Sequence, residues 1–234
     1  MAGSDGVVNA VSLYVQTRDL SFEDIHVDAA RRVAAAAREA GAAMVQISGL
    51  GSDPNSPQRY IRARGQGEVA VRQAHPEAVI VRSSVMFSAR GGLVEQILGV
   101  LRRAPVFPLF GRGGTRLQPV HRDDVAAAVA RLLDRDDIAL CECGGPEVKT
   151  YRAIVRQIAE AAGIEPRLVP MGFPLWRVMA KVAERLPGAP LTRDQVALMR
   201  DDNLADPGRP GLADLGIAPR PLAAALEARF GGED

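Results

Sequence analysis

Two patterns of hydrophobic residues alternate along the first part of the chain, one typical of strands and one typical of helices. Short apolar runs stand at 6–11, 42–48 and 78–82. Between them lie longer segments in which apolar residues return every three or four positions, as on one face of a helix. Strands that alternate with amphipathic helices are typical of parallel sheets covered by helices. We therefore expect an α/β fold, and we expect the run at 6–11 to be a strand covered on both faces.

Capping residues set the ends of the first helices. Ser21 is a good N-cap residue with Asp24 three positions later, which is a short capping box, and Gly41 is a typical helix terminator. A second helix is expected to begin near Pro57 and to end about Ala74. It contains Gly65 and Gly67, each costing ~1 kcal/mol relative to alanine. Either another backbone approaches closely there, or the helix is under little constraint.

After residue 82 the pattern is less regular. Apolar spacing and caps predict further helices, including one that Thr150 caps and Gly163 ends. The predicted helices cover 91–105, 122–134, 150–163, 173–188, 191–203 and 221–230. Strands are expected within 106–120, at 138–145 and at 167–171.

Composition and net charge argue against some classes of function. The 234 residues are 47% hydrophobic but only 4% aromatic, so the core must be built from Ala, Val, Leu and Ile. A net charge of +1 gives no basis for a nucleic-acid partner. No apolar run reaches ~18 residues and the start has no signal-peptide pattern, so we expect a cytoplasmic location.

A few residues with metal-binding or titratable side chains need an interpretation. Cys141 and Cys143 lie two positions apart in an apolar stretch, on one face of a strand, and are expected to be reduced structural thiols. His26 and His75 have no partners in the sequence and are interpreted as surface or capped residues.

Several segments in one order carry a family resemblance. They are "GVVNAV", "VQISGLG", "RYIRARGQGE", "VIVRSSVMF", "LQPVHRDDVAAAV", "CECGGPEVKTYRAIV" and "LTRDQVALMRDDN". From about Gly6 to Ala224 the chain resembles the atypical, extended branch of the short-chain dehydrogenase/reductases, in the group of the nucleotide-binding accessory subunit of respiratory complex I and its bacterial relatives. The resemblance implies a partial Rossmann-like domain over 1–145 and a small, mostly helical lobe over 146–234 that is packed closely against it.

The family also implies a cofactor. Its members open with a strand, a glycine-rich turn and a helix that holds the pyrophosphate of NAD(P). This chain starts at what resembles the fourth strand, so about two βαβ units of ~30 residues each would be missing upstream. The glycine clusters "SGLGSDP" and "GRGGTR" are interpreted as turns. NAD(P) is the cofactor that the family implies, but the glycine-rich phosphate loop is absent from this sequence.

The missing strands imply partners. In the family strand order 3-2-1-4-5-6, the run at 6–11 would lie at an edge of the sheet. It carries no charge or proline that would blunt such an edge. We expect it to pair with a separately encoded N-terminal piece, with another protein or with a second copy, or else to aggregate. The resemblance further implies association with a respiratory complex, peripheral to the inner membrane.

A proton-transfer site is the chemical core of the wider family. A serine orients the reacting oxygen, a tyrosine transfers the proton, and a lysine four residues after the tyrosine stabilises its phenolate. Ser48 and Tyr60 match this pattern, but position 64 is Arg64. Arginine keeps the charge but does not release a proton. The three residues are therefore a vestigial site, a working site or an ordinary helix surface.

Other positions follow from the resemblance alone. It implies cofactor contacts for Asn9, Ser83, Ser84 and Val85, and substrate contacts for Gln118 and His121. Ser83 and Ser88 stand where the family has proline and glycine, which would reshape the wall beside the nicotinamide. Asp124 borders the expected substrate cleft or simply begins a helix.

One C-terminal helix is amphipathic. Its apolar stripe consists of Phe173, Trp176, Met179, Val182, Ala183 and Leu186, and its basic face of Arg177, Lys181 and Arg185. Such a helix lies on a membrane or partner surface, or packs on its own domain.

Two functions remain open. The first is a non-catalytic or weakly catalytic accessory or assembly protein linked to a respiratory NADH:quinone oxidoreductase. The second is an NAD(P)H-dependent oxidoreductase or epimerase that uses Ser48, Tyr60 and Arg64, with the dinucleotide-binding part supplied elsewhere.

Overall fold

The computed structural model describes residues 3–184 and 191–231, which form two compact units. Unit 1 consists of residues up to Ser83, Asp123–Cys143 and Ala205–Ala218. Unit 2 consists of Ser84–Arg122, Gly144–Leu204 and the residues from Pro219 on. The expected boundary at 145/146 falls near one of the points where the chain passes from one unit to the other, but the chain passes between them at four further points as well.

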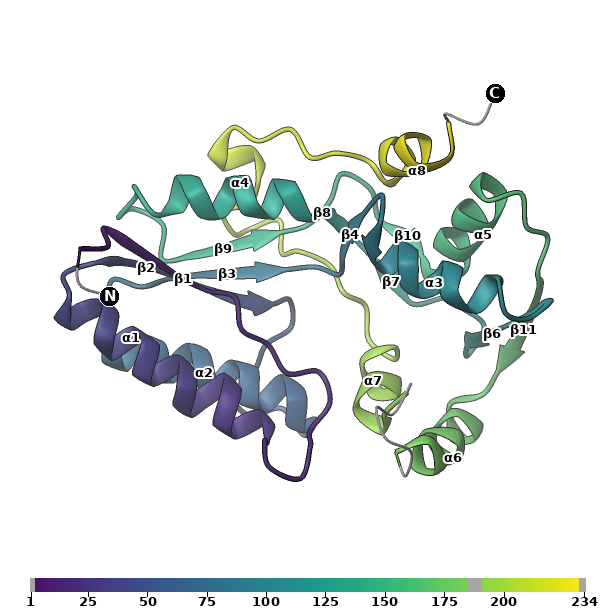
Figure 1. The fold of residues 1–234 in the computed structure, drawn as a ribbon, viewed down its shortest axis with the longest axis horizontal. Helices are drawn as coiled ribbons and strands as arrows, with labels where there is room; N and C mark the ends of the chain where they lie inside the picture. Colours follow the sequence, from purple (N-terminus) through teal and green to yellow (C-terminus); the bar gives the residue numbers. More distant parts are fainter. Residues whose placement is uncertain (1–2, 185–190, 232–234) are drawn as a thin grey trace. The chain divides into compact units, whose positions relative to one another are not determined.

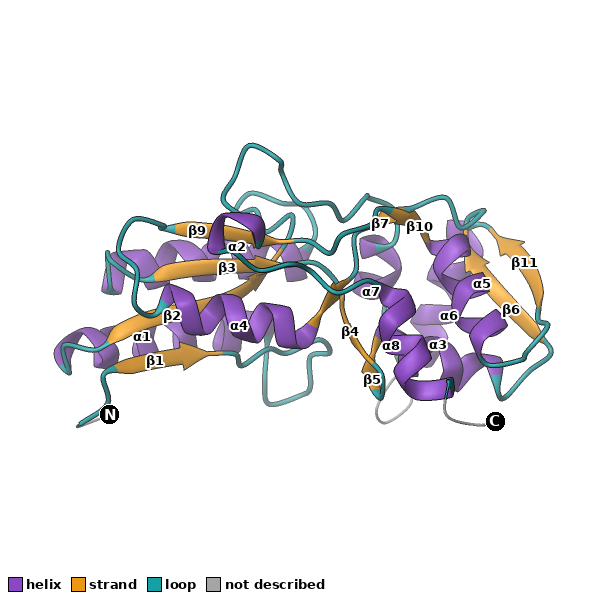
Figure 2. Ribbon diagram, turned by 90° about the horizontal axis from the view of Figure 1, so that it is seen from above, coloured by secondary structure: helices purple, strands orange, loops and turns teal. Residues whose placement is uncertain are grey.

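Unit 1 is built on a parallel sheet, which confirms the expected fold class. Its strands are β1 (Gly6–Asn9), β2 (Ala43–Gly49), β3 (Val79–Ser83) and β9 (Leu140–Cys143), in the order β1-β2-β3-β9. Figures 1 and 2 show them side by side. Ser48 of β2 stands opposite Arg82 of β3, and Arg82 stands opposite Glu142 of β9. This register aligns three polar residues in one row across the sheet.

Helices cover both faces of this sheet. A π-helical turn, Asp24–Ala29, leads into α1 (Ala30–Glu39), which packs with α2 (Arg59–Ala74) on one face. In Figure 1, α4 (Arg122–Leu132) lies on the opposite face. A short 3₁₀ turn, Ala213–Leu215, completes the unit.

Local capping explains where the helices begin and end. The Ser21 hydroxyl accepts from the backbone N–H of Asp24 at 3.1 Å, and the Asp24 carboxylate accepts from the Ser21 N–H at 2.8 Å. The expected capping box is therefore confirmed. Gly41 has φ +66°, as the residue after a helix end requires. Pro57 lies just before the N-cap residue of α2 rather than in its first turn.

Unit 1 has a core of small residues, which follows from the low aromatic content. The cluster between α1, α2 and the sheet consists of Ala30, Ala34, Ala37, Met44, Val71, Ala78 and Ile80. Cys141 and Cys143 are also buried, as free thiols. The surface interpretation of the histidines is wrong, because His26 and His75 are both buried. His75 also terminates α2, where its N–H donates to the Val71 carbonyl.

Strand β1 lies at an edge of the described sheet, as expected. The expectation that both of its faces are covered is wrong, because Val8 is 43% exposed. An apolar side chain at an open edge is a site for strand pairing.

Unit 2 contains small sheets and five helices among its described residues. Its strands are β4 (Met86–Ser88), β5 (Gly91–Gly92), β6 (Val106–Phe110), β7 (Arg116–Leu117), β8 (Val120–His121), β10 (Lys149–Thr150) and β11 (Arg167–Met171). Its helices are α3 (Leu93–Leu101), α5 (Tyr151–Ala161), α6 (Phe173–Ala183), α7 (Arg193–Leu198) and α8 (Leu222–Phe230). Strands β6 and β11 pair in parallel, and α3, α5 and α8 share one apolar core. Thr150 caps α5, as the sequence predicts.

The stripe predicted for α6 is partly wrong. Trp176 is buried, and its indole N–H donates to the Leu109 carbonyl at 3.1 Å. Met179 and Val182, which were expected on the same face, are exposed. Arg185 and Leu186 lie outside the described residues.

The two glycines of α2 mark places where other backbone approaches closely. A Cβ at Gly65 would lie 2.3 Å from the carbonyl carbon of Asp53, and one at Gly67 would lie 2.0 Å from the carbonyl oxygen of His26. Contacts this short are impossible for a side chain. Close approach, rather than loss of constraint, therefore explains both glycines.

We expect Gly67→Ala to lower the free energy of unfolding by about 2 kcal/mol, because the clash with backbone outweighs the ~1 kcal/mol gained in helix propensity. Gly99→Ala in α3 is the matched control, since a Cβ there meets nothing within 4 Å. It should stabilise the protein by up to ~1 kcal/mol. Urea denaturation measures both, and an equally stabilising Gly67→Ala would contradict the close contact.

Candidate functional site

Tyr60 and Arg64 form a buried pair on α2. They lie one turn apart, and the Arg64 Nη1 donates a hydrogen bond to the Tyr60 hydroxyl at 2.7 Å. The same Nη1 lies 3.4 Å from the Ser12 hydroxyl. Both residues are less than a tenth exposed. The interpretation as an ordinary helix surface is therefore wrong for this pair.

Aromatic rings surround the tyrosine. The Tyr60 ring stacks on Tyr14 at 5.9 Å between centroids and meets the edges of Phe22 at 5.4 Å and His26 at 5.6 Å. Burial raises the pKa of Tyr60, and the Arg64 charge offsets this only in part. Burial also lowers the pKa of His26, helped by the charge of Arg64. Desolvation therefore outweighs the neighbouring cation, and the phenol stays protonated at neutral pH.

The Ser48 hydroxyl forms its hydrogen bonds with Glu68 and Ser52, and not with Tyr60 or Arg64. Its Oγ donates to the Glu68 carboxylate at 2.5 Å and lies 3.0 Å from the Ser52 hydroxyl. The Ser52 hydroxyl lies 2.7 Å from the Gly49 carbonyl, to which it can donate. A serine hydroxyl has one proton to donate. With that proton held by Glu68, Ser48 has none left for the oxygen of a substrate.

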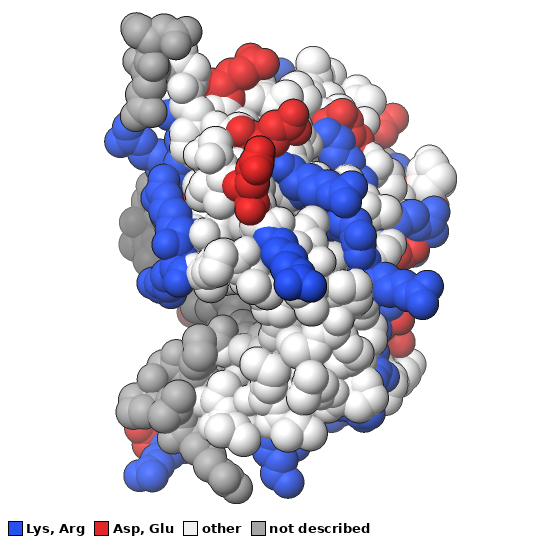
Figure 3. All heavy atoms as spheres, turned by 90° about the vertical axis from the view of Figure 1, so that its right-hand side faces the viewer, with Lys and Arg blue, Asp and Glu red and all other residues white. Residues whose placement is uncertain are grey.

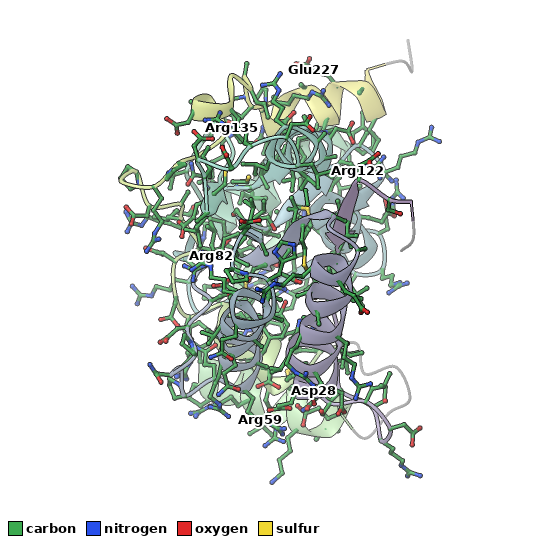
Figure 4. All side chains as sticks on the ribbon, turned by 90° about the vertical axis from the view of Figure 1, so that its left-hand side faces the viewer. Asp28, Arg59, Arg82, Arg122, Arg135 and Glu227 are labelled. Carbon is green, nitrogen blue, oxygen red and sulfur yellow. The ribbon has the colours of Figure 1, made fainter. Side chains whose placement is uncertain are left out.

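Arg82 holds the acceptor in place. Its guanidinium donates to Glu68 Oε1 from Nε at 3.0 Å and to Oε2 from Nη2 at 2.7 Å. Its Nη1 also lies 3.4 Å from Glu142 Oε1, and the Arg209 Nε lies 3.5 Å from the same oxygen. Hydrogen bonding to Glu68 raises the pKa of Arg82. In Figure 4, Arg82 is near the centre of the view, whereas Asp28 and Arg59 are near its lower edge.

Little space separates Ser48 from Arg64. A cavity of about 10 Å³ lies between them, lined by His26, Gln46, Ser48, Arg64, Gly67 and Glu68. That is about the volume that one water molecule needs. The Arg64 Nε is buried and has no protein partner. The space suits a single water beside this nitrogen.

The two residues of unit 1 that were expected to contact the cofactor, Asn9 and Ser83, form hydrogen bonds within their own unit. The Asn9 Nδ2 donates to Gln46 Oε1 at 2.8 Å, and its Oδ1 accepts from the N–H of Val11 at 3.2 Å. The Ser83 hydroxyl donates to the Ser48 carbonyl at 3.4 Å. Asn9, Ser48 and Ser83 come from the carboxyl ends of adjacent strands, where ligands bind in α/β sheets.

In unit 2, one asparagine organises the expected cofactor segment. The Asn203 Oδ1 accepts from the Ser84 hydroxyl at 2.7 Å and from the Val85 N–H at 3.3 Å. Its backbone also bonds to Arg116 and Gln118. Asn203 ends the "LTRDQVALMRDDN" segment, which carried the family resemblance without a role for this residue.

The two expected substrate residues also lie in unit 2. The Gln118 Nε2 donates to the Gly145 carbonyl at 2.8 Å. The His121 ring meets the edge of Phe87 at 5.3 Å, and its Nδ1 lies 3.3 Å from the Arg220 Nη1.

Neither glycine cluster opens a helix. In "SGLGSDP", Gly51 has φ +76° and the Ser52 N–H bonds back to Gly49, so the segment is a turn ahead of a loop. In "GRGGTR", Gly111 and Gly113 have φ +58° and +73° and join β6 to β7. Neither of these two turns therefore supplies the helix N-terminus that is a ready-made site for a pyrophosphate.

Sequence reasoning missed Glu68 and Arg82. Glu68 stands at the next i+4 position after Tyr60 and Arg64, so helical spacing alone places all three along one side of α2. Arg82 is the charged residue of an otherwise apolar strand. A lone charge there requires a buried counter-charge, and this was the available signal.

A spectrophotometric titration tests the state of Tyr60. The difference between the wild type and Tyr60→Phe isolates its phenol, which should ionise above its ordinary value of ~10. The folded pKa lies above the unfolded one, so the stability that this proton contributes is present below pH ~10 and is lost as pH rises through the folded value. Arg64→Met should raise the pKa further. A pKa below the ordinary value would contradict the burial argument.

Removing the charge of Glu68 tests the buried network. We expect Glu68→Gln to lower the free energy of unfolding by about 2 kcal/mol, because Arg82 loses its main counter-charge while Glu142 remains. Asp137→Asn is the control, since its partner Arg135 is at the surface and a surface pair contributes little. Equal stability of Glu68→Gln and wild type in urea denaturation would show that the network carries no stability.

Comparisons with known proteins give homologues over nearly the whole chain. No protein-family model matches. The chain is 32% identical over 236 residues to the mitochondrial NADH dehydrogenase [ubiquinone] 1 alpha subcomplex subunit 9 of Arabidopsis thaliana, with 95% of this chain and 59% of the relative covered. It is 28% identical over 226 residues to the mitochondrial NADH-ubiquinone oxidoreductase 40 kDa subunit of Neurospora crassa, covering 94% and 59%. A ceramide reductase of Caulobacter vibrioides matches 74% of the chain at 29% identity, over 55% of its own length.

Solved structures show the same fold. A nucleoside-diphosphate-sugar epimerase from Staphylococcus aureus matches 97% of the chain and 77% of its own length, with a TM-score of 0.72 and 16% identity. A dTDP-4-dehydrorhamnose reductase from Bacillus anthracis, solved in complex with NADP, matches 98% and 81%, with a TM-score of 0.67 and 15% identity.

These matches confirm the resemblance that the sequence motifs gave, although the chain spans only 59% of the length of the NADH dehydrogenase subunits it matches. The chain is a homologue of these NADH dehydrogenase subunits and has the Rossmann-like fold of the epimerase and reductase structures that it matches.

Proposed function

We propose that the chain acts as a non-catalytic accessory or assembly protein of a respiratory NADH:quinone oxidoreductase. The observation that carries the proposal is the hydrogen bond of 2.5 Å from Ser48 to Glu68. In this bond the Ser48 hydroxyl donates to Glu68 the proton that, in a reductase of this fold, it would donate to the substrate. The relatives named as NADH dehydrogenase subunits support the respiratory setting.

The buried tyrosine supports the same proposal. A proton-transfer tyrosine works when its pKa lies near the working pH. Burial raises the pKa of Tyr60 above its ordinary value, and so moves it further from neutral pH. Arg64 also differs from lysine in keeping its proton, so a relay through this position to solvent is not available. Ser48, Tyr60 and Arg64 then serve as a rigid structural core at the ends of β2 and α2.

Nucleotide binding and assembly give separate tests. Isothermal titration of the purified chain with NADPH and NADH should show no tight binding, and a dissociation constant below about 1 μM would overturn the non-catalytic part. In the native host, a tagged chain should co-migrate with NADH:quinone oxidoreductase on native gels of solubilised membranes. Deleting the gene should lower the amount of assembled complex. If the tagged chain migrates apart from the oxidoreductase, and the deletion strain contains a normal amount of assembled complex, the proposed link to the respiratory oxidoreductase is overturned.

The second candidate is an NAD(P)H-dependent reductase or epimerase. The 2.7 Å bond between Arg64 and Tyr60 favours it, because it keeps a cation on the phenol oxygen. The ceramide reductase match agrees with this class. A bound nicotinamide would supply hydride, Tyr60 would give its proton to the reacting oxygen, and a partner strand on β1 would bring the dinucleotide site. NADPH oxidation that depends on an added N-terminal fragment and is lost in Tyr60→Phe would favour this candidate over the first.

A further inference from the structure

Helix α6 presents an apolar face that no described residue covers. Leu175, Val178, Met179 and Val182 are 53%, 60%, 45% and 58% exposed. They stand at i, i+3, i+4 and i+7, which places them on one stripe of the helix. The lower part of Figure 3, at the height of α6 in Figure 1, shows a broad area without charged side chains. A contiguous apolar stripe of this kind marks an interaction surface.

The opposite side of α6 already has its packing. Trp176 stacks on Phe110 at 4.3 Å between ring centroids and bonds to the Leu109 carbonyl. Ala180 is fully buried in the same cluster, together with Val196 of α7. The helix is therefore fixed on unit 2 by one side, and the apolar stripe is left over from that packing. It is a second apolar face and is not needed for the fold.

The charged residues of α6 indicate what kind of surface binds the apolar stripe. Arg177 and Lys181 are both exposed and lie one turn apart, along one border of the stripe. Within Phe173–Ala183 there is no acidic residue. Apart from Met179 the stripe is aliphatic, and it contains no aromatic or arginine side chain, which together with Met are the types that protein interfaces favour. An aliphatic face with cations at its border fits the boundary between the acyl chains and the headgroups of an anionic bilayer.

We propose that the exposed face of α6 binds the surface of an anionic phospholipid bilayer. The four aliphatic side chains enter the boundary between headgroups and acyl chains, while Arg177 and Lys181 contact lipid phosphates. Among the described residues no helix is both long and apolar enough to cross a bilayer, so the contact is with the surface. The inference rests on the proposed function for its setting, a membrane-bound oxidoreductase, but its chemistry belongs to α6 alone.

Vesicle flotation with the purified chain tests this contact without any oxidoreductase present. The chain should bind phosphatidylcholine vesicles that contain phosphatidylglycerol, and raised salt should weaken the binding. Leu175→Ser with Val178→Ser should lower the partition coefficient about tenfold or more. Val148→Ser is the matched control, because Val148 is also half exposed in unit 2 but lies off α6. Both side chains of the double variant are exposed, so folding is preserved, and circular dichroism checks this.

The cations are tested separately. Arg177→Gln with Lys181→Gln should lower binding to the anionic vesicles about tenfold or more and leave binding to pure phosphatidylcholine unchanged. Arg102→Gln with Arg103→Gln, two exposed arginines after α3, is the matched control. Wild-type chain that stays unbound, or binding that the serine variants do not weaken, would overturn the inference. So would a dimer in sedimentation that the serine variants abolish, because a second copy would then cover the stripe. Failure here leaves the nucleotide and native-gel tests of the proposed function unaffected.

Discussion

The register of three parallel strands places Ser48, Arg82 and Glu142 side by side, and α2 brings Glu68 onto this row. Arg82 is partly buried in the middle of a sheet, and a guanidinium in that position needs carboxylates within hydrogen-bonding reach. Glu68 and Glu142 meet that need. The nearest hydroxyl, that of Ser48, then donates to the carboxylate at 2.5 Å. An electrostatic requirement of the fold thus determines the chemistry of the residue at the end of β2.

The rest of α2 follows from the same constraint. For Glu68 to reach Arg82, the helix must lie close to the sheet and to the π-helical turn beside it, and Gly67 makes that approach possible. The same close packing buries Tyr60 among aromatic rings and leaves room for about one water beside Arg64. The tyrosine and the serine occupy the positions that the family motif predicts, but each is turned to a partner within the protein.

Local chemistry made much of this predictable from the sequence. Ser21 and Asp24 cap one helix and Thr150 caps another, because capping depends on neighbouring residues. The edge position of β1 was predicted from the strand order that the family resemblance implies. The partner of Ser48 was not predicted, because it depends on strand register and on how α2 sits on the sheet. The orientation of α6 was not predicted either. Trp176 and Val178 belong to two apolar faces of one helix, and sequence periodicity does not say which face is buried. The burial of His26 likewise depends on the path of the loop before α1, whose Leu13 backbone bonds to the ring.

Nuclear magnetic resonance of the Ser48 hydroxyl proton tests the central claim most directly. If Ser48 donates to Glu68 inside a water-poor core, its hydroxyl proton should exchange slowly, resonate at low field and correlate with the Glu68 carboxyl carbon. The Glu68→Gln variant should lose both the signal and the correlation. A hydroxyl proton that exchanges with water too fast to detect in the folded wild type, with no correlation to Glu68, would contradict the account and leave Ser48 free to act on a substrate.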